Sequence, residues 1–481
     1  MTHQSPHNLL VIVIDQFRAD LLTGPLAAVA DLPNLRRLAG QSLHFTDHHT
    51  VTVPCGPARA SLLTGQYAMS HRSVYNGTPL SARTPNLATE LRKLGRELLL
   101  FGYTDTQPDP TGLPDCDPAH LSYTGPIPGA TEVVEMREEA WAWLAHLRGK
   151  GYDVPDTDAA DFARLYKPVD GKLGSRALYR AEDSDTAYLT DRTLEQLDIR
   201  KSRPWSALLT YIRPHPPFVA PDPWHAMFDP AAMPAPTLPD YDHPFFEAFH
   251  SSPSGRDLFW DFDGRQNAMS ADQIARCRAT YLGLAAEVDY HIGRVLDWLD
   301  ATGQADDTML VLTADHGEML GDLGIWGKTA PFRTASQVPL MIRAPGVAGG
   351  TVDTPTQSVD VTPTILSALG GEVPRQMQGQ SLLNDAPAQG AVMVEVELGH
   401  PSGSGRFETT WDSASEACRA VAFERDGWRL VHFAGGQPPM LFDIAADAGC
   451  TQNHAPSMPE RVAAMRADLL DWRMTKAAPL V

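Results

Sequence analysis

A cysteine placed between two prolines opens the stretch of sequence with the most evident chemistry. In VTVPCGPARASLLTGQY (51–67), Cys55 is followed by Pro57 and Arg59, and SLLTG continues with a helical pattern. A helix that begins near Pro57 directs its first backbone N–H groups and the positive end of its dipole toward Cys55. A permanent cation and a helix terminus beside this side chain indicate a reactive group in an anion-binding site. The alternative is a small buried cysteine ahead of a helix.

Two further pairs of polar residues each follow an apolar run with the character of a buried strand. Asp15 and Gln16 come after NLLVIVI, and Asp315 and His316 come after TMLVLTA. Ligands bind at the carboxyl ends of strands in doubly wound sheets, so these four side chains can converge. Oxygen ligands from two carboxylates and an amide, with one imidazole, suit Ca²⁺, Mg²⁺ or Mn²⁺ better than a soft-ligand zinc site. Each acid taken alone could instead be a helix cap.

The elements that would position these residues alternate between strands and helices. Continuous apolar runs, typical of strands buried on both faces, occur at 8–14, 97–103, 204–212, 308–314 and 338–343. The clearest helix spans 272–303, where apolar residues recur near helical spacing and Gly303 closes the run. This alternation predicts an α/β fold, in which a large and mostly parallel sheet is sandwiched by helices.

The pattern changes toward the C-terminus. From about residue 385, the short strands AVMVEVE, RAVAFE, GWRLVHF and PMLFDI precede an amphipathic helix, PERVAAMRADLLDWRM. They predict a small antiparallel sheet with a terminal helix. We therefore expect a catalytic domain over 1–384 and a C-terminal subdomain over 385–481. Residues 214–270, rich in Pro, Asp, Phe and His without a period, are expected to form a long structured insertion.

The composition disfavours several classes of partner. A formal net charge of −20 over 481 residues argues against nucleic acid, whose phosphates are bound by surplus Lys and Arg. The five cysteines share no paired spacing, and no segment approaches the ~20 consecutive apolar residues that span a bilayer. The first apolar run lacks a basic leader and a small-residue cleavage site, which favours a strand over a signal peptide. We expect a cytoplasmic protein without a membrane partner.

The residues around Cys55 resemble those of a known family. C-x-P-x-R followed by SLLTG is the pattern of the sulfatases, a branch of the alkaline phosphatase superfamily, and the resemblance extends along most of the chain. It implies an alkaline phosphatase-like fold. It also implies that Cys55 is converted after translation to formylglycine, whose hydrated aldehyde is the nucleophile. The expected cofactors are this formylglycine and one divalent metal ion, calcium or manganese.

Several other segments are similar to the phosphonate monoester hydrolases and their arylsulfatase relatives: HRSVYNGTPL, LLLFGYTDTQPDP, GYDVP, RPHPPFVAP and DHGEMLGDLGIWGK. By this resemblance, the metal is held by Asp15, Gln16, Cys55, Asp315 and His316. The same resemblance places in the substrate pocket Asn76, Tyr103, His215 and Lys328. Many other sulfatases carry an Asp where this chain has Gln16, although choline sulfatases also have Gln.

One position departs from the pattern of this subfamily. A hydroxyl there follows the pocket tyrosine by two residues, whereas this chain has Asp105 after Tyr103, flanked by Thr104 and Thr106. Strand alternation would direct Asp105 to the same side as Tyr103, where a carboxylate repels an anionic substrate. We therefore expect either that Thr106 takes the substrate-binding role through a bulge or that the pocket prefers a different ester.

These residues also indicate how an ester would be cleaved. Catalysis on a sulfate monoester or a phosphodiester must neutralise negative charge as the nucleophile approaches, and the metal, Arg59 and Lys328 supply positive charge. His215 lies between prolines and is the expected acid for the leaving oxygen, the alternative being a hydrogen-bonded structural histidine. The second hydroxyl of a formylglycine hydrate can expel the product by C–O cleavage, which a serine could not do.

The sequence therefore predicts a metal-dependent hydrolase of phosphonate monoesters, phosphodiesters and sulfate monoesters, with a nucleophile derived from Cys55. Its expected partners are a small anionic ester, a formylglycine-generating enzyme during maturation, and further copies of itself. The alternatives are a dedicated arylsulfatase or choline-sulfatase-like enzyme, and a non-catalytic anion-binding protein with an unmodified Cys55. A phosphatase or mutase of the same superfamily would need Ser or Thr at this position.

Overall fold

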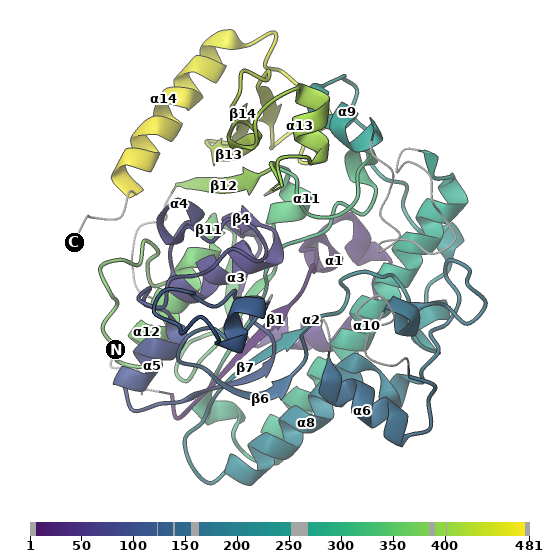
Figure 1. The fold of residues 1–481 in the computed structure, drawn as a ribbon, viewed down its shortest axis with the longest axis vertical. Coiled ribbons are helices and arrows are strands. Elements are labelled where there is room, and N and C mark those ends of the chain that lie inside the picture. Colours follow the sequence, from purple (N-terminus) through teal and green to yellow (C-terminus); the bar gives the residue numbers. More distant parts are fainter. Residues whose placement is uncertain are drawn as a thin grey trace.

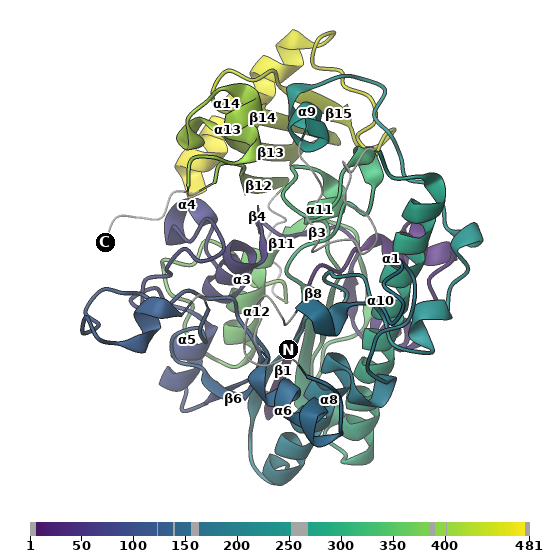
Figure 2. The same ribbon diagram turned by 45° about the vertical axis from the view of Figure 1, so that its right-hand side comes forward.

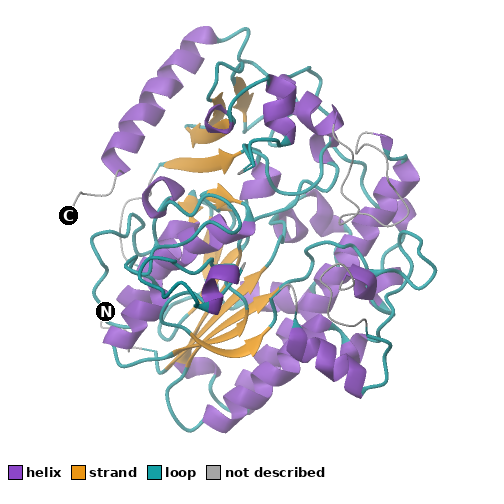
Figure 3. Ribbon diagram, in the orientation of Figure 1, coloured by secondary structure: helices purple, strands orange, loops and turns teal. Residues whose placement is uncertain are grey.

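A large β-sheet lies between two layers of helices, and a smaller sheet stands beyond one end of it (Figure 3). The computed structural model describes residues 6–122, 124–137, 140–154, 163–251, 268–383, 390–400 and 402–476. This architecture is the predicted α/β fold.

The strands of the large sheet follow the order β10 (Gly350–Val352), β2 (Leu43–Phe45), β9 (Leu340–Arg343), β8 (Thr308–Ala314), β1 (Asn8–Ile14), β7 (Ser206–Tyr211), β5 (Leu98–Gly102) and β6 (Thr131–Glu135). Neighbours are parallel except that β9 runs antiparallel to both β8 and β2. Each apolar run named as a strand forms one. The prediction missed β2 and β10, which are only three residues long, and β6, whose sequence TEVVE is polar because it is a half-exposed edge strand.

Strand β1 shows why these runs are continuously apolar. Its alternate residues Leu10, Ile12 and Ile14 belong to the core on one face of the sheet, while Leu9, Val11 and Val13 belong to the core on the other. Both faces are buried, so the six residues from Leu9 to Ile14 are all apolar, and the one polar residue, Asn8, lies at the start of the strand and is hydrogen-bonded.

Helices from separate parts of the chain cover the two faces (Figure 1). One face is covered by α2 (Pro33–Gly40), α6 (Trp141–Gly149), α8 (Asp185–Arg200) and α10 (Ala271–Ala301). The other face is covered by α3 (Cys55–Thr64), α5 (Leu87–Lys93) and α12 (Val361–Ala368). Helix α10 begins at a capping box in which Ser270 and Gln273 satisfy each other's backbone N–H groups, close to the predicted start.

The small sheet is mixed, whereas a purely antiparallel one was expected. Its order is β15 (Met440–Asp443), β14 (Trp428–Phe433), β13 (Arg419–Arg425), β12 (Ala391–Glu397) and β4 (Thr52–Val53). The first four are the predicted antiparallel strands. Strand β4 comes from the N-terminal part of the chain and pairs parallel with β12, beside which it lies in Figure 2. A two-residue strand carries no periodic signal, so this pairing arises only from the tertiary structure.

Helices also cover both faces of the small sheet. One face packs against α9 (Pro244–Ser251) and α13 (Arg406–Trp411), and the other against α14 (Pro459–Lys476). The predicted boundary between residues 384 and 385 lies outside the described residues, as does part of the predicted insertion. The described part of that insertion contains short helical turns and α9.

The remaining short elements connect these layers. They are α1 (Asp20–Thr23), α4 (Ala68–His71), α11 (Arg333–Ser336), β3 (His48–His49), β11 (Thr356–Gln357), η1 (Pro25–Ala28), η2 (Pro118–Leu121), η3 (Ala163–Tyr166), η4 (Ala181–Asp183), η5 (Trp224–Ala226), η6 (Pro230–Ala232), η8 (Ala305–Asp307), η9 (Asp322–Gly324), η10 (Ser358–Asp360) and η11 (Ser415–Ala417). Within the described ranges, no helix combines the length and the apolar character needed to cross a membrane.

Candidate active site

Strands β1 and β8 bring the two predicted metal-binding pairs together. They are parallel neighbours in register, with Ile14 opposite Ala314, so Asp15 and Asp315 leave the sheet side by side. Asp315 Oδ1 accepts hydrogen bonds from the backbone nitrogens of Gln16 at 3.1 Å and His316 at 2.8 Å. The carboxyl edge of the sheet therefore assembles both pairs, as the sequence predicted.

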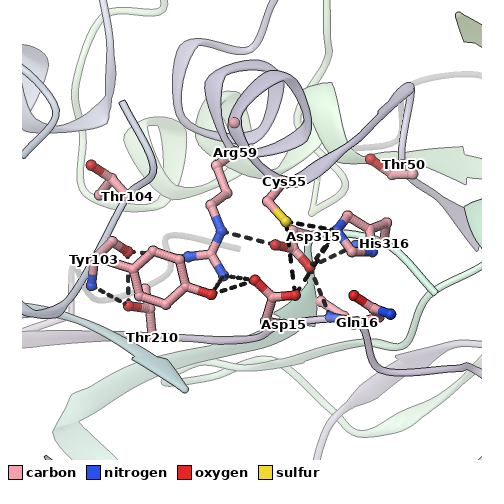
Figure 4. Close-up of polar contacts among 12 residues, drawn as sticks. Asp15, Gln16, Thr50, Cys55, Arg59, Tyr103, Thr104, Thr210, Asp315 and His316 are labelled. Atoms are coloured by element: carbon pink, nitrogen blue, oxygen red, sulfur yellow. Dashed lines mark hydrogen bonds and ion pairs between the residues drawn. The ribbon is translucent and has the colours of Figure 1, made fainter. Parts of the chain in front are cut away.

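Cys55 is the first residue of α3 and points into this cluster (Figure 4). Its Sγ lies 3.2 Å from His316 Nε2, 3.0 Å from Lys328 Nζ and 4.0 Å from Asp15 Oδ1. Two residues earlier, β4 ends in the small sheet, so the start of α3 is anchored by both sheets of the molecule. The side chain is buried and reaches both the cationic and the carboxylate groups of the site.

Arg59 follows one helical turn after Cys55 and bridges the two aspartates. Its Nε lies 2.8 Å from Asp315 Oδ2, and its Nη2 lies 3.1 Å from Asp15 Oδ2. The guanidinium is 2 % exposed and stacks 4.1 Å from the ring centroid of Tyr103. Arg59 thus holds one oxygen of each carboxylate, and the Oδ1 atoms remain on the side of Cys55 and His316 (Figure 4).

This arrangement fits a divalent cation. The ligand atoms offered by Asp15, Cys55, Asp315 and His316 all lie within 4.8 Å of one another. His316 Nδ1 is hydrogen-bonded to the carbonyl of Gly317 at 3.0 Å, which leaves Nε2 for the cluster. Two carboxylate oxygens beside one imidazole suit a hard cation such as calcium, magnesium or manganese.

Gln16 is held by a residue that the sequence analysis missed. Glu318 is buried and accepts hydrogen bonds from the backbone nitrogens of Leu320 at 2.9 Å and Gly327 at 2.6 Å, and from Gln16 Nε2. Gln16 Oε1 is therefore turned the other way, toward Lys328 Nζ at 2.9 Å. The feature of the sequence that could have indicated Glu318 is the acid in DHGEMLG, three positions after Asp315.

The side chain of Tyr103 is part of the hydrogen-bond network formed by Arg59 and Asp15. Its hydroxyl accepts from Arg59 Nη2 at 2.9 Å and donates to Asp15 Oδ2. Its backbone is clamped by Thr210, whose Oγ1 accepts from Tyr103 N at 2.7 Å and donates to Tyr103 O at 2.8 Å. Gly102 permits this approach, because a Cβ there would lie 2.3 Å from Thr210 Oγ1.

Asn76 and Thr106 differ in how they relate to the cluster. Asn76 Oδ1 accepts from the backbone nitrogen of Gly56 at 2.9 Å, so its side chain lies at the start of α3 beside Cys55. The Thr106 hydroxyl instead hydrogen-bonds within its own loop, 3.1 Å from Thr104 Oγ1. Its assignment as a substrate-binding residue stays a prediction.

Strand alternation does not decide the direction of Asp105, because β5 ends at Gly102 and Asp105 has a φ of 52°. Asp105 is 8 % exposed. Burial first, then Asp15 and, to a smaller extent, Asp315 and Asp105, raise the pKa of the Cys55 thiol, against the effect of Lys328. The unmodified thiol is therefore protonated near neutral pH, and the negative charge of Asp105 acts on the site.

His215 lies in the loop that follows β7. Its Nδ1 donates to the carbonyl of Pro216 at 2.6 Å. Burial and the charge of Lys328 lower the pKa of His215 to about 3, although Asp15 opposes them. The imidazole is neutral near pH 7 in the absence of substrate, and its Nε2 is then a proton acceptor.

The cations of the site keep the carboxylate of Asp15 ionised. Although burial alone would raise it, the pKa of Asp15 is lowered by neighbouring positive charge, which at neutral pH, where His215 is uncharged, comes from Lys328 and Arg59. Conversely, burial lowers the pKa of Lys328, but Cys55 and Asp15 raise it to a net value above its usual range. At neutral pH the site therefore contains an ionised Asp15 and a charged Lys328, which provide negative charge for a cation and positive charge for an anionic ester.

Comparisons with known proteins agree with this geometry. The sulfatase family model matches residues 7–371. The multifunctional alkaline phosphatase superfamily protein PehA of Trinickia caryophylli is 34% identical over 498 aligned positions, which cover 98% of this chain and 96% of that protein. A choline-sulfatase of Rhizobium meliloti is 28% identical, covering 93% of this chain and 82% of that protein.

Solved structures give the same result. The phosphonate monoester hydrolase SpPMH from Silicibacter pomeroyi superposes with a TM-score of 0.92 at 43% identity, covering 99% of this chain and 96% of that one. The phosphonate monoester hydrolase of Agrobacterium radiobacter superposes with a TM-score of 0.89 at 32% identity, covering 98% and 96%. From its matched length, its fold and the cluster around Cys55, this chain belongs to the sulfatase family and is an ester hydrolase.

Proposed function

We propose that the chain hydrolyses phosphonate monoesters, phosphodiesters and sulfate monoesters, using formylglycine derived from Cys55. One observation carries the proposal. Position 55 lies between a metal-binding cluster and a cation, since its Sγ is 3.2 Å from His316 Nε2 and 3.0 Å from Lys328 Nζ. A nucleophile placed there meets a reacting centre whose negative charge is already neutralised.

The surroundings of Cys55 favour an oxygen nucleophile over a thiolate. Burial and the neighbouring aspartates raise the pKa of the thiol, so an unmodified cysteine would react slowly. A hydrated aldehyde at the same position presents two hydroxyl groups. A divalent cation bound by Asp15, Gln16, Asp315 and His316 would supply positive charge that makes one hydroxyl easier to ionise.

The reaction then takes two steps. One hydroxyl of residue 55 loses its proton and forms a bond to phosphorus or sulfur, the bond from that atom to the ester oxygen breaks, and the leaving oxygen takes up a proton, so the number of protons is unchanged. The second hydroxyl then loses its proton, its C–O bond becomes the carbonyl, and the other C–O bond breaks to release the product. The aldehyde is restored, and one water molecule rehydrates it.

Three charged or polar groups would assist these steps from fixed positions. Lys328 and Arg59 compensate the negative charge of the ester, and Arg59 does so while holding both aspartates. His215 is the proposed acid for the leaving oxygen. Its pKa of about 3 describes the site without substrate, and an anionic ester beside it would raise that pKa.

The charges of the pocket favour a substrate with one negative charge at the reacting centre. Phosphonate monoesters, phosphodiesters and sulfate monoesters share this property, whereas a phosphate monoester approaches two charges near neutral pH. The names of the relatives support the same range, because they include phosphonate monoester hydrolases, a multifunctional protein and a choline-sulfatase. We therefore propose a promiscuous hydrolase rather than a dedicated arylsulfatase.

The proposal is tested by measuring kcat/KM for 4-nitrophenyl phenylphosphonate, bis(4-nitrophenyl) phosphate and 4-nitrophenyl sulfate with the same preparation. Intact-protein mass accompanies the assay, since conversion of the thiol to the aldehyde lowers the mass by about 18 Da and hydration restores it. Turnover of all three esters by protein with the converted residue is expected. A preparation that carries the aldehyde and cleaves only the sulfate would favour a dedicated arylsulfatase.

The expected partners and compartment form part of this proposal. A formylglycine-generating enzyme is required for maturation, and a cytoplasmic location is supported by five free cysteines. Self-association is supported by Leu470 and Met474, which are 60% and 70% exposed one turn apart on α14. Light scattering of the purified chain measures whether it is larger than its 52.4 kDa monomer.

A further inference from the structure

We propose that Arg213, anchored by Asp185, is a positioning residue that fixes the imidazole of His215 for proton transfer to the leaving group. The inference rests on the proposed function, because it concerns how His215, the proposed acid, is oriented. It starts from the loop RPHPPF, which follows β7 and carries His215.

This loop has few backbone donors of its own. Pro214, Pro216 and Pro217 have no backbone N–H, so a ladder of main-chain hydrogen bonds cannot hold the segment. The backbone nitrogen of His215 makes a 3.0 Å hydrogen bond to the carbonyl of Ile212. Val219 N adds a 2.9 Å hydrogen bond to the carbonyl of Pro217, and side-chain donors can supply the hydrogen bonds that the prolines cannot.

Arg213 provides these donors. Its Nη1 donates to the carbonyl of His215 at 2.8 Å and to the carbonyl of Pro217 at 3.2 Å. The carbonyl of Pro216, between them, accepts from His215 Nδ1 at 2.6 Å. The guanidinium and the imidazole are therefore hydrogen-bonded to the carbonyls of consecutive peptide groups. A shift of the guanidinium would move the same short segment to which the imidazole is bound.

The guanidinium is itself immobilised from the opposite side. Arg213 Nε donates to Asp185 Oδ2 at 2.9 Å, and the guanidinium lies 4.2 Å from the ring centroid of Tyr166. Tyr166 donates to the same carboxylate oxygen at 3.2 Å. Asp185 Oδ1 accepts from the backbone nitrogen of Thr186 at 2.8 Å, so the pair is tied to the first turn of α8.

Both partners are almost fully buried, with side-chain exposures of 1% for Arg213 and 2% for Asp185. Burying an ion pair costs desolvation free energy, so it adds little stability of its own, but it has a well-defined geometry. The planar fork of an arginine can hold a carboxylate through Nε and two carbonyls through Nη1 at once, whereas a lysine has a single nitrogen. The chemistry needs this precision, because proton transfer requires hydrogen-bond distance and direction.

The test is a double-mutant cycle on two esters that differ in their need for an acid. A 4-nitrophenolate leaves without a proton, whereas an unsubstituted phenolate benefits from one. We expect Arg213→Lys to lower kcat/KM for phenyl phenylphosphonate by at least about tenfold and to lower it much less for the 4-nitrophenyl ester. In a His215→Asn background, Arg213→Lys should produce no further difference between the two esters.

Asp185→Asn provides an independent variant with the same expected pattern, because it weakens the anchor without changing volume. Arg429→Lys is the matched control, since Arg429 is a buried arginine of the small sheet that also binds a carboxylate and a backbone carbonyl. Its effect should be equal on both esters.

Equal losses on the two esters in Arg213→Lys and Asp185→Asn, or the same leaving-group difference with and without His215, would overturn the positioning role. A wild-type protein that carries the aldehyde and cleaves neither ester would instead count against the proposed function. Circular dichroism and thermal unfolding of each variant show whether it is folded, so that a loss of activity caused by unfolding is distinguished from one caused by a misoriented imidazole.

Discussion

Arg59 binds one oxygen of the Asp315 carboxylate and leaves the other oxygen on the side of His316. Asp315 Oδ2 accepts from Arg59 Nε at 2.8 Å, and Oδ1 lies 3.7 Å from His316 Nε2 within the proposed metal cluster. An ordinary surface salt bridge would use either oxygen, but here burial and a second bond from Arg59 to Asp15 fix which oxygen lies toward His316 and Cys55. The arginine therefore orients the two acidic side chains, and in the proposed mechanism it also compensates the negative charge of the ester.

Asp315→Asn tests this arrangement. Both oxygens of Asp315 accept hydrogen bonds, Oδ2 from Arg59 and Oδ1 from the backbone nitrogens of Gln16 and His316, so in either orientation of an asparagine its amide nitrogen replaces an acceptor, and the negative charge is lost. We expect metal affinity to fall by at least about tenfold, and activity to fall with it. Metal content after dialysis, measured by inductively coupled plasma mass spectrometry, checks this. Asp300→Asn, on the exposed side of α10, is the control. Full metal content in Asp315→Asn, or undiminished activity in a metal-free sample, would refute the metal site.

Glu318→Gln changes the orientation of Gln16 without changing volume. Glu318 accepts all three of its hydrogen bonds, so a glutamine that keeps the backbone donors of Leu320 and Gly327 would direct its own NH₂ group at Gln16 Nε2. Two donors cannot pair, and Gln16 must rotate its oxygen away from the cluster. We expect metal affinity to fall about 10- to 100-fold in a competition titration. Glu395→Gln, in the small sheet, should leave that affinity unchanged.

Cys55→Ala removes the proposed nucleophile. Alanine has neither a hydroxyl nor the capacity to form the aldehyde, so we expect kcat/KM to fall by more than about 1,000-fold while thermal unfolding is nearly unchanged. Cys55→Ser should give at best one turnover, because a serine ester cannot expel the product by C–O cleavage, and mass spectrometry should detect the adduct. Cys116→Ala, at an exposed cysteine, should be fully active. Near-normal turnover by Cys55→Ala would refute formylglycine catalysis.

The charge of Asp105 predicts the order of substrates. With 4-nitrophenol as the common leaving group, we expect phosphonate monoesters or diesters to be at least comparable to sulfates, and phosphate monoesters to be the poorest. Asp105→Thr removes a negative charge that acts on the site and should raise kcat/KM for anionic esters. Asp109→Thr, in the same loop region, is the control. The prediction fails if phosphate monoesters are the best substrates, and unchanged kinetics in Asp105→Thr would place that carboxylate outside the pocket.

Arg333 links the large and small sheets and predicts a pH-dependent stability. It pairs with Asp47 at 2.5 Å and with Glu424 of β13, which also pairs with Arg429 at 3.0 Å. Although burial opposes them, His49 and Arg333 lower the pKa of Asp47, and Arg333 and Arg429 lower that of Glu424. Carboxylates with depressed pKa values stabilise the fold above the unfolded pKa, and this contribution is lost as pH falls through the folded pKa.

Arg333→Met should therefore destabilise the protein by about 3 kcal/mol at pH 7, because it leaves the buried Glu424 and the partly buried Asp47 without this partner. The difference from wild type should shrink as the pH falls below about 4, where these carboxyl groups take up protons in the unfolded chain while their depressed pKa values keep them ionised in the folded protein. Urea unfolding across that range measures it. Arg192→Met breaks an exposed pair with Glu195 and a distant contact with the ring of Tyr188, and should cost less than about 0.5 kcal/mol at any pH. A cost for Arg333→Met that is independent of pH would contradict the ionic origin.

The sequence alone predicted the parts of the molecule that depend on local pattern. Strands β1, β5, β7, β8 and β9 were recognisable because both of their faces are buried, which leaves uninterrupted apolar runs. Their order along the chain, with helices between them, implied a parallel sheet, and a parallel sheet brings Asp15 and Asp315 to one edge. The motif around Cys55 carried the family resemblance without any structure.

Only the tertiary structure decided how the site is held together. Three contacts join residues that carry no shared local signal. Strand β4 pairs with β12, Gln16 donates a hydrogen bond to Glu318, and Arg213 donates one to the carbonyl of His215. Asp105 shows the same limit, because the pattern of a strand gives a side-chain direction only as far as the strand extends, and β5 ends at Gly102. Local propensity acts over a few residues, whereas these contacts depend on how separate segments pack, so their geometry exists only in the folded chain.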